Sequence, residues 1–240
     1  MPIILKTPTS FRYDKNIITA FTDGSLNITA LPSQVTIIES YVFNDCTNLA
    51  LTALPEGLTS IGYSSFGGCS KIALTALPSR LARIGAHAFS GCTNLALTSL
   101  PEGITSIENR TFYGCTSLAL NSLPSGVTNI SDSAFYGCVK LSLSSLPEGL
   151  KNISSETFYG CTNLALTSLP EGLINIWGRA FYGCTNLKSL SIGKNIQTIG
   201  SNAFVNCTNL TSITINRAPN SVTGAPWGAT NATITWTGTT

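Results

Sequence analysis

The chain has 240 residues, of which 43% are hydrophobic and only 10% are charged, and its formal net charge is +2. This composition permits a substantial core and argues against disorder, because disordered segments combine low hydrophobicity with high charge. The chain contains no run of basic residues, and no stretch approaches the roughly 18 apolar residues that a membrane span needs. We therefore expect no nucleic-acid partner and no membrane insertion.

Residues 1–19 precede the repeats described below. We expect them to form an N-terminal cap or to be the remnant of an upstream domain. The opening MPIILKTPTSFRYDKN has an apolar run of only three residues, far short of a signal-peptide core. The sequence therefore predicts no signal peptide in this chain, so that it is an intracellular or virion protein or a piece of an exported one.

From residue 20 to 217 the sequence repeats itself every 23 residues. The segment CTNLALTSLPEG stands at 92–103 and again at 161–172, and a degenerate copy at 20–42 carries Asp23 at the position of the later cysteines. A fixed period of about 20 to 50 residues indicates a solenoid or array, and this length suits one coil of a leucine-rich repeat. The positions that keep the period are Phe43, Phe66, Phe89, Phe112, Phe135, Phe158, Phe181 and Phe204, and, three residues after each, Cys46, Cys69, Cys92, Cys115, Cys138, Cys161, Cys184 and Cys207.

The residue types within each copy predict the path of one coil. Apolar positions such as Leu164, Leu166 and Leu169 are expected to point inward, where stacking on neighbouring coils buries them. The Gly, Asn or Asp before each cysteine indicates a left-handed backbone position. Prolines such as Pro170 are expected to end a strand, because proline cannot donate to a ladder. With coils about 4.8 Å apart, we expect about nine of them, with a parallel β-sheet on one wall and short 3-10, helical or irregular segments on the other.

Residues 218–240 are expected to form a C-terminal β cap. The alternation of Ala232, Ile234 and Trp236 predicts a strand that covers the last coil. Trp227 is expected to pack against it.

The segment AFYGCTNLKSLSIGKNIQTIGSNAF at 180–204 resembles the repeat of the BspA-like (Treponema pallidum type) leucine-rich repeat proteins, F-x-x-C-x-x-L-x-x-L-x-L-P-x-x-L-x-x-I-G-x-x-A-F. The resemblance covers about residues 20–217. The inner copies depart from it, with LALTSLP where the family has L-x-x-L-x-L-P. The resemblance implies a leucine-rich repeat solenoid and adhesion to host proteins or to other bacteria. The tail from Asn216 is similar to the closing segment of repeat proteins from bacterial surfaces and phage tails.

The eight cysteines have three possible roles. A metal site needs converging ligands, such as a C-x-x-C with a partner pair, whereas here each coil supplies one cysteine and His87 is the single histidine. Equivalent α-carbons in adjacent coils lie about 5 Å apart, which is inside the disulfide range, but their side chains point the same way. We favour a buried column of reduced thiols over disulfides, and we expect no metal and no cofactor.

Two sets of positions are candidate ligand contacts. Tyr113, Tyr136, Tyr159 and Tyr182 follow the repeat phenylalanine in successive copies, as either a stacked ladder over a coil corner or an exposed strip that binds sugar or protein. The positions around and after the repeat isoleucine vary between copies, which fits a solvated wall or a binding face, and Trp and Arg are frequent hot-spot residues. The candidates at these variable positions are Tyr63, His87, Arg110, Asp132, Glu156, Trp177 and Arg179.

The sequence favours a protein that is not an enzyme. His87 has no phased Ser or Cys partner, and the glutamates recur in the turn LPEGL as a solvated rim, so no catalytic triad or acid–base pair is expected. Our first hypothesis is a recognition module at a cell surface, outside the cell or on a virion, which binds a protein or glycan on another cell. The alternatives are a receptor-binding component of a phage tail and a structural spacer between other domains.

Overall fold

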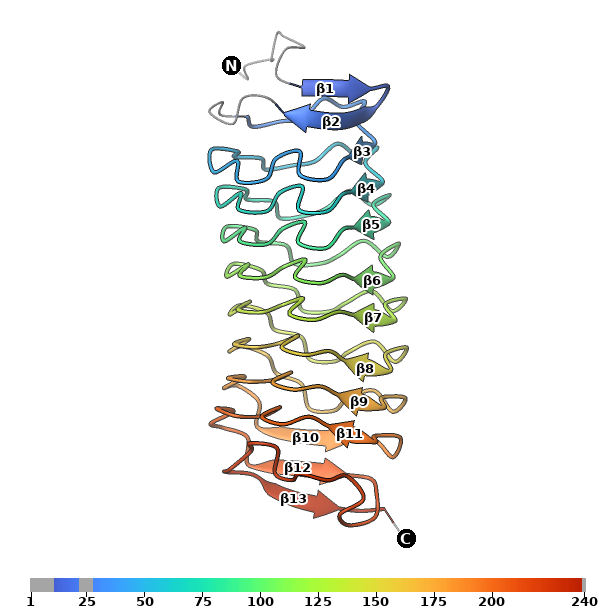
Figure 1. The fold of residues 1–240 in the computed structure, drawn as a ribbon, viewed down its shortest axis with the longest axis vertical. Coiled ribbons are helices and arrows are strands. Elements are labelled where there is room, and N and C mark those ends of the chain that lie inside the picture. Colours follow the sequence, from blue (N-terminus) through green and yellow to red (C-terminus); the bar gives the residue numbers. More distant parts are fainter. Residues whose placement is uncertain (1–10, 22–27, 239–240) are drawn as a thin grey trace.

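The computed structural model describes residues 11–21 and 28–238, which form one elongated stack of coils (Figure 1). The predicted leucine-rich repeat solenoid is confirmed. One wall carries short parallel strands in which equivalent residues pair between neighbouring coils, such as Ile38 with Ile61 and Ile61 with Ile84. These strands are β3 (Ile37–Ile38), β4 (Ser60–Ile61), β5 (Arg83–Ile84), β6 (Ser106–Ile107), β7 (Asn129–Ile130), β8 (Asn152–Ile153), β9 (Asn175–Ile176) and β11 (Thr198–Ile199).

An antiparallel hairpin begins the stack. Its strands are β1 (Phe11–Asp14) and β2 (Ile17–Phe21), and β2 also pairs in parallel with β3, so that Ile18 lies against Ile38. Ile18 is buried, so the hairpin covers the first coil. Strand β2 crosses the expected boundary between cap and repeats at residue 19. Asp23 of the degenerate copy lies outside the described residues.

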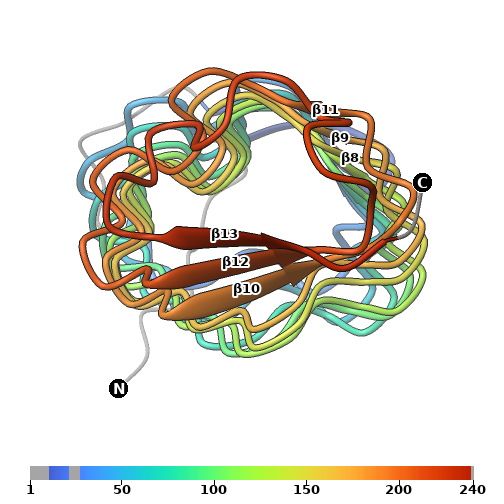
Figure 2. The same ribbon diagram turned by 90° about the horizontal axis from the view of Figure 1, so that it is seen from below.

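A separate three-stranded parallel sheet occupies another wall near the C-terminal end. It contains β10 (Ser189–Ile192), β12 (Ser212–Ile215) and β13 (Thr233–Trp236), and Figure 2 shows it across the stack from β8, β9 and β11. Strand β13 contains Ile234 and Trp236, as the alternating pattern predicts. Trp227 is buried, lies 23 residues after Phe204, and accepts the Phe204 backbone N–H on its carbonyl oxygen at 3.0 Å. Residues 218–238 therefore form one further, divergent coil.

The strand expected before each proline is wrong for the inner copies. The segment LALTSLP makes few backbone hydrogen bonds between coils there, for example from Ala165 N–H to the Leu143 carbonyl at 3.2 Å, and it forms no named strand. Leu166 and Leu169 are both buried although they are three residues apart, whereas side chains of a strand alternate with period two. Only the alternating SLSI and SITI of the last copies extend into β10 and β12.

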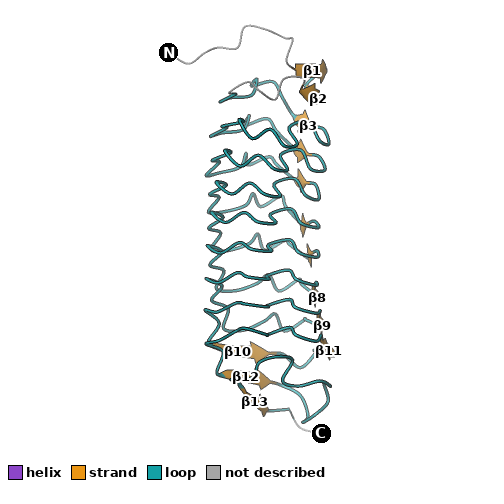
Figure 3. Cartoon of the chain, turned by 60° about the vertical axis from the view of Figure 1, so that its left-hand side comes forward, coloured by secondary structure: helices purple, strands orange, loops and turns teal. Residues whose placement is uncertain are grey.

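The remaining segments of the coils are turns and irregular backbone (Figure 3). Of the expected 3-10, helical or irregular segments, the described residues contain the irregular kind and no helix. None of the elements described for these residues has the length and hydropathy of a membrane-spanning helix.

The phenylalanines stack into one ladder through the core. Each of the eight is 0% exposed, and successive ring centroids lie 5.2 to 5.9 Å apart with nearly parallel planes. Their backbone N–H groups bond to the next coil, as from Phe135 to the Thr157 carbonyl at 3.0 Å. The phenylalanine column therefore joins the coils through both the ring stack and the backbone.

The cysteines run beside this ladder, and all eight are buried and free. From Cys69 onward, each thiol donates to the carbonyl oxygen of the phenylalanine 26 residues earlier, at 2.9 to 3.1 Å. The glycines before the inner cysteines have φ of 69 to 75°, and Asp45 and Asn206 have 59° and 60°, so the predicted left-handed position is confirmed.

The thiols of the folded protein should resist alkylation at pH 8. Only the thiolate reacts, and burial raises the pKa of Cys207, one of the outer thiols, to about 12 from an ordinary value of 9.0. We expect less than one labelled cysteine per chain after an hour with iodoacetamide in native buffer, and all eight after addition of guanidinium, measured by mass spectrometry. Rapid labelling of several inner cysteines in native buffer would contradict the buried column.

Candidate recognition surface

A second left-handed position recurs in each of the eight coils that carry a ladder phenylalanine, two residues before it, and it is never glycine. Its φ values lie between 50 and 63°. A left-handed conformation costs a residue with a Cβ about 1–2 kcal/mol, so the stacked coils must hold it in place. We call this set the left-handed column: Tyr41, Ser64, His87, Arg110, Ser133, Glu156, Arg179 and Asn202. Four of the residues predicted from sequence variation belong to it.

The tyrosines form a stacked ladder one residue past the phenylalanines. Ring centroids are 4.6 Å apart for Tyr113 and Tyr136, 4.4 Å for Tyr136 and Tyr159, and 4.5 Å for Tyr159 and Tyr182. All four side chains are partly exposed. Because the faces cover one another, the ring edges and hydroxyls are the parts that solvent reaches. We call these four residues the tyrosine ladder.

Charged side chains of the left-handed column flank the tyrosine ladder. The Arg110 guanidinium lies 5.6 Å from the Tyr113 ring centroid. Arg179 Nη1 lies 3.3 Å from Glu156 Oε1, and the Ser133 hydroxyl donates to Glu156 Oε2 at 3.4 Å. Burial, and then the neighbouring phenols, raise the pKa of Tyr136 above its ordinary value of 10.0.

Tyr63 and His87 form a separate aromatic cluster nearer the N-terminal end. The Tyr63 ring lies 5.1 Å from that of Tyr41 and 5.3 Å from that of His87. Tyr41 is 61% exposed and Tyr63 is 41% exposed. Burial, followed by the positive charge of Arg110, lowers the pKa of His87, which is therefore neutral at pH 7. Tyr41 was not among the residues predicted from the sequence, although it holds the same repeat position as His87, two copies earlier.

The last two predicted residues make no side-chain contact with the tyrosine ladder that the structure records. Asp132 Oδ1 accepts the backbone N–H of Ser155 at 3.0 Å, and its carbonyl accepts that of Arg110 at 3.1 Å, so this residue joins coils. Trp177 is 46% exposed directly after β9. The structure thus brings the tyrosine ladder together with Arg110, Glu156 and Arg179, and brings Tyr63 together with His87.

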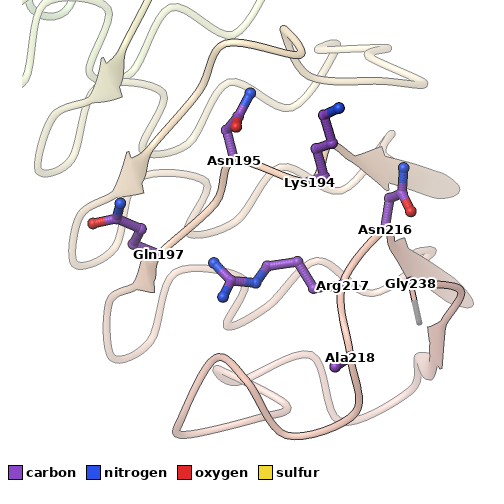
Figure 4. Close-up of a pocket in the computed structure, with 7 residues that line it drawn as sticks. All are labelled: Lys194, Asn195, Gln197, Asn216, Arg217, Ala218 and Gly238. Carbon is purple, nitrogen blue, oxygen red and sulfur yellow. The ribbon is translucent and has the colours of Figure 1, made fainter. Parts of the chain in front are cut away.

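Near the C-terminal end there is a pocket of about 480 Å³ that contains none of the predicted residues. Arg217 extends into it, and its guanidinium donates to the Ile196 carbonyl (Figure 4). The side chains around it are amides and cations, which suit an anionic group. The pocket is formed by the last copies, whose sequences depart from the repeat pattern. That departure was the sequence feature that could have indicated a separate site here. The lining residues are Lys194, Asn195, Gln197, Asn216, Arg217, Ala218 and Gly238.

The side chains on these surfaces are of kinds that bind ligands. Stacked phenols bury apolar surface, and guanidinium groups and amides form hydrogen bonds and, for the guanidinium groups, charge interactions. Across residues 11–21 and 28–238, no group of His, Cys, Asp and Glu side chains could hold a metal ion.

The model of the BspA-type leucine-rich repeat region, in six copies, matches residues 18–142 and 128–226, and the chain belongs to this family. A leucine-rich repeat protein from T. pallidum is similar at 28% identity, over 85% of this chain and 89% of that one, with a TM-score of 0.51. A leucine-rich repeat protein from Eubacterium ventriosum has 21% identity over 91% of this chain and 71% of that one, with a TM-score of 0.48. A leucine-rich cell surface protein from Faecalibacterium prausnitzii has 20% identity over 97% and 94%, with a TM-score of 0.44. No curated protein matches the chain.

Family membership indicates a protein-binding or recognition role. The matching family is a repeat family and not a catalytic one, and proteins of this kind are typically non-enzymatic binding modules. Extended solenoids suit this role because they present broad surfaces.

Proposed function

We propose that the chain is a non-catalytic recognition module that binds a protein on another cell through the tyrosine ladder and its flanking charges. The observation that carries this proposal is the stack of four partly exposed tyrosine rings, 4.4 to 4.6 Å apart. Tyrosine and arginine are enriched in protein interfaces. Rings that are already stacked lose little conformational freedom on binding, which favours affinity.

The charges beside the ladder give it an orientation. Arg110 lies at the Tyr113 end, whereas the Glu156–Arg179 pair lies beside the other end, so a partner meets a cation at one end and a mixed pair at the other. Complementary charge chiefly provides specificity and association rate. We propose that this module lies at a cell surface, outside the cell or on a virion, and serves adhesion there.

The test is binding of labelled protein to intact bacteria, epithelial cells and immobilised matrix proteins. Tyr136→Ala with Tyr159→Ala should weaken binding to the partner at least tenfold, because it removes the middle of the ladder. The matched control is Ser122→Arg with Ser145→Arg, two exposed positions on the LALTSLP wall. We expect this control to bind like the parent protein.

Each other result would change the proposal. Binding lost only in the serine variant would move the site to the LALTSLP wall. Binding confined to particular bacteria would favour a phage or inter-bacterial receptor function, and binding to epithelial cells or matrix would favour a host adhesin. Absence of binding to every surface would contradict recognition and favour a structural spacer.

A further inference from the structure

A trough of about 490 Å³ crosses the wall of short strands near the N-terminal end. It extends over four successive coils and ends at the coil in which the tyrosine ladder begins. Its volume lies within the range of about 300–1,000 Å³ found for small-molecule sites. The lining residues are Ile37, Ile38, Glu39, Ser40, Ser60, Gly62, Tyr63, Arg83, Gly85, Ala86 and Glu108.

Two coils of the trough have glycine directly after the strand, so their backbones lie close to the coil before. This repeat position is Glu39, Gly62, Gly85 and Glu108 in successive coils. A Cβ on Gly62 would lie 2.5 Å from Ser40 N, and one on Gly85 would lie 2.7 Å from Gly62 C, so the backbones approach too closely for any other residue. The floor is therefore bare backbone, and a carboxylate stands at each end. Three coil steps of about 4.8 Å place the two carboxylates about 14 Å apart along the stack.

The polar groups of the trough are mixed in charge. Glu108 is held in place by the Ser106 hydroxyl, which donates to its Oε1 at 2.8 Å. Arg83 projects from β5 between the two carboxylates, and Ser60 from β4 lies beside it. The site thus offers acceptors at both ends and donors in the middle.

One side of the trough is formed by the aromatic ring of Tyr63, whose position is fixed by its neighbours. Tyr63 packs against Tyr41 and His87, and its backbone N–H donates to the Ser40 hydroxyl at 3.2 Å. Its ring is still 41% exposed. A fixed, partly exposed ring supplies an apolar surface at little entropic cost.

We propose that this trough binds a short neutral oligosaccharide. Two carboxylates disfavour an anionic ligand, and Arg83 between them disfavours a polycationic one. A neutral chain of sugar rings satisfies both, since its hydroxyls donate to Glu39 and Glu108, accept from Arg83, and leave an apolar ring face for Tyr63. This site does not depend on protein binding by the tyrosine ladder.

The test uses ligand-observed saturation-transfer NMR and calorimetry with cellotriose, maltotriose, laminaritriose and N-acetylchitotriose. Sialyllactose and a tetra-arginine peptide are the charged comparisons. Two variants change the trough: Tyr63→Ala removes the ring, and Ser60→Arg fills the middle with a residue that the next coil already carries as Arg83. Trp177→Ala is the control, because it removes an exposed aromatic residue at the repeat position of Gly85, four coils away.

We expect at least one neutral trisaccharide to bind, to lose at least tenfold in affinity in both trough variants, and to keep its affinity in Trp177→Ala. Circular dichroism at 20 °C should show that all three variants stay folded. The proposal is overturned if no neutral trisaccharide binds, if only a charged compound binds, or if both trough variants bind like the parent. Binding of cells or proteins by the same samples reports separately on the tyrosine ladder, so failure of one site is distinguishable from failure of the other.

Discussion

Replacement of Phe135 by alanine should lower the free energy of unfolding by about 3–5 kcal/mol, measured by guanidinium titration. The ring is 0% exposed and is stacked on Phe112 at 5.6 Å and on Phe158 at 5.7 Å. Backbone hydrogen bonds hold both neighbours, as from Phe112 N–H to the Ala134 carbonyl at 2.9 Å. The coils therefore cannot close the cavity, and two stacking contacts are lost together.

The matched control is Tyr136→Ala at the next residue. That ring is also stacked on both sides but is partly exposed, so its removal leaves no closed cavity and should cost about 1 kcal/mol. In a solenoid each coil contacts only its neighbours, so Phe135→Ala should also broaden the transition as the two halves uncouple. Equal losses for the two variants would mean that the phenylalanine ladder does not carry the stability of the stack.

The stack of coils was predictable from the sequence because it depends only on the spacing of the repeated residues. Phe and Cys recur at a constant spacing, and only coils stacked in register turn that spacing into columns of identical side chains. The left-handed glycines before the cysteines were predictable for a chemical reason, since Asp45 and Asn206 replace glycine in the outer copies. Both inferences depend only on residue type and spacing, and neither requires the path of the backbone within a coil.

The location of the sheet and of the recognition surfaces depends on the path of the backbone within each coil. The sequence predicts one strand through Leu166 and Leu169 up to Pro170, but both leucines turn inward, which a strand does not allow at a spacing of three. The regular pairing therefore lies on the isoleucine wall in the inner coils. Left-handed backbone at Arg110 and Glu156 has no sequence signature, because no glycine marks it. The trough was likewise hidden, because the sequence does not show that Gly62 and Gly85 form a backbone floor between Glu39 and Glu108. Variation between copies located several of these positions, whereas their grouping into separate surfaces is a property of the three-dimensional stack.

Alkaline pH should unfold this protein unusually steeply. Burial away from water raises the pKa of the six inner thiols far above the ordinary value of 9.0, so the folded state keeps these protons while the unfolded state releases them. Their contribution is complete below pH 9 and is lost as the pH rises from 9 toward the folded pKa. At pH 10 each thiol costs about 1.4 kcal/mol, or about 8 kcal/mol for the six, against a typical total stability of about 5–15 kcal/mol. The thiols are those of Cys69, Cys92, Cys115, Cys138, Cys161 and Cys184.

Guanidinium titrations at pH 7, 9, 9.5 and 10 measure this loss directly, and thiolate absorbance at 240 nm should rise together with unfolding. The decisive comparison is Cys115→Ala with Cys138→Ala, which removes two of the six inner thiols and leaves Cys207, whose pKa burial raises to about 12, in place. This variant should be less stable than the parent at pH 7, because it loses two buried thiols that donate to the Phe89 and Phe112 carbonyls. Above pH 9.5, however, its stability should fall with pH only about five-sevenths as steeply, because five of the seven thiols with a strongly raised pKa remain. The gap between the two proteins therefore narrows as the pH rises. An unchanged slope would assign the alkaline sensitivity to tyrosines or lysines. A parent protein equally stable at pH 7 and pH 10 would mean that the inner thiols are not held protonated by the fold.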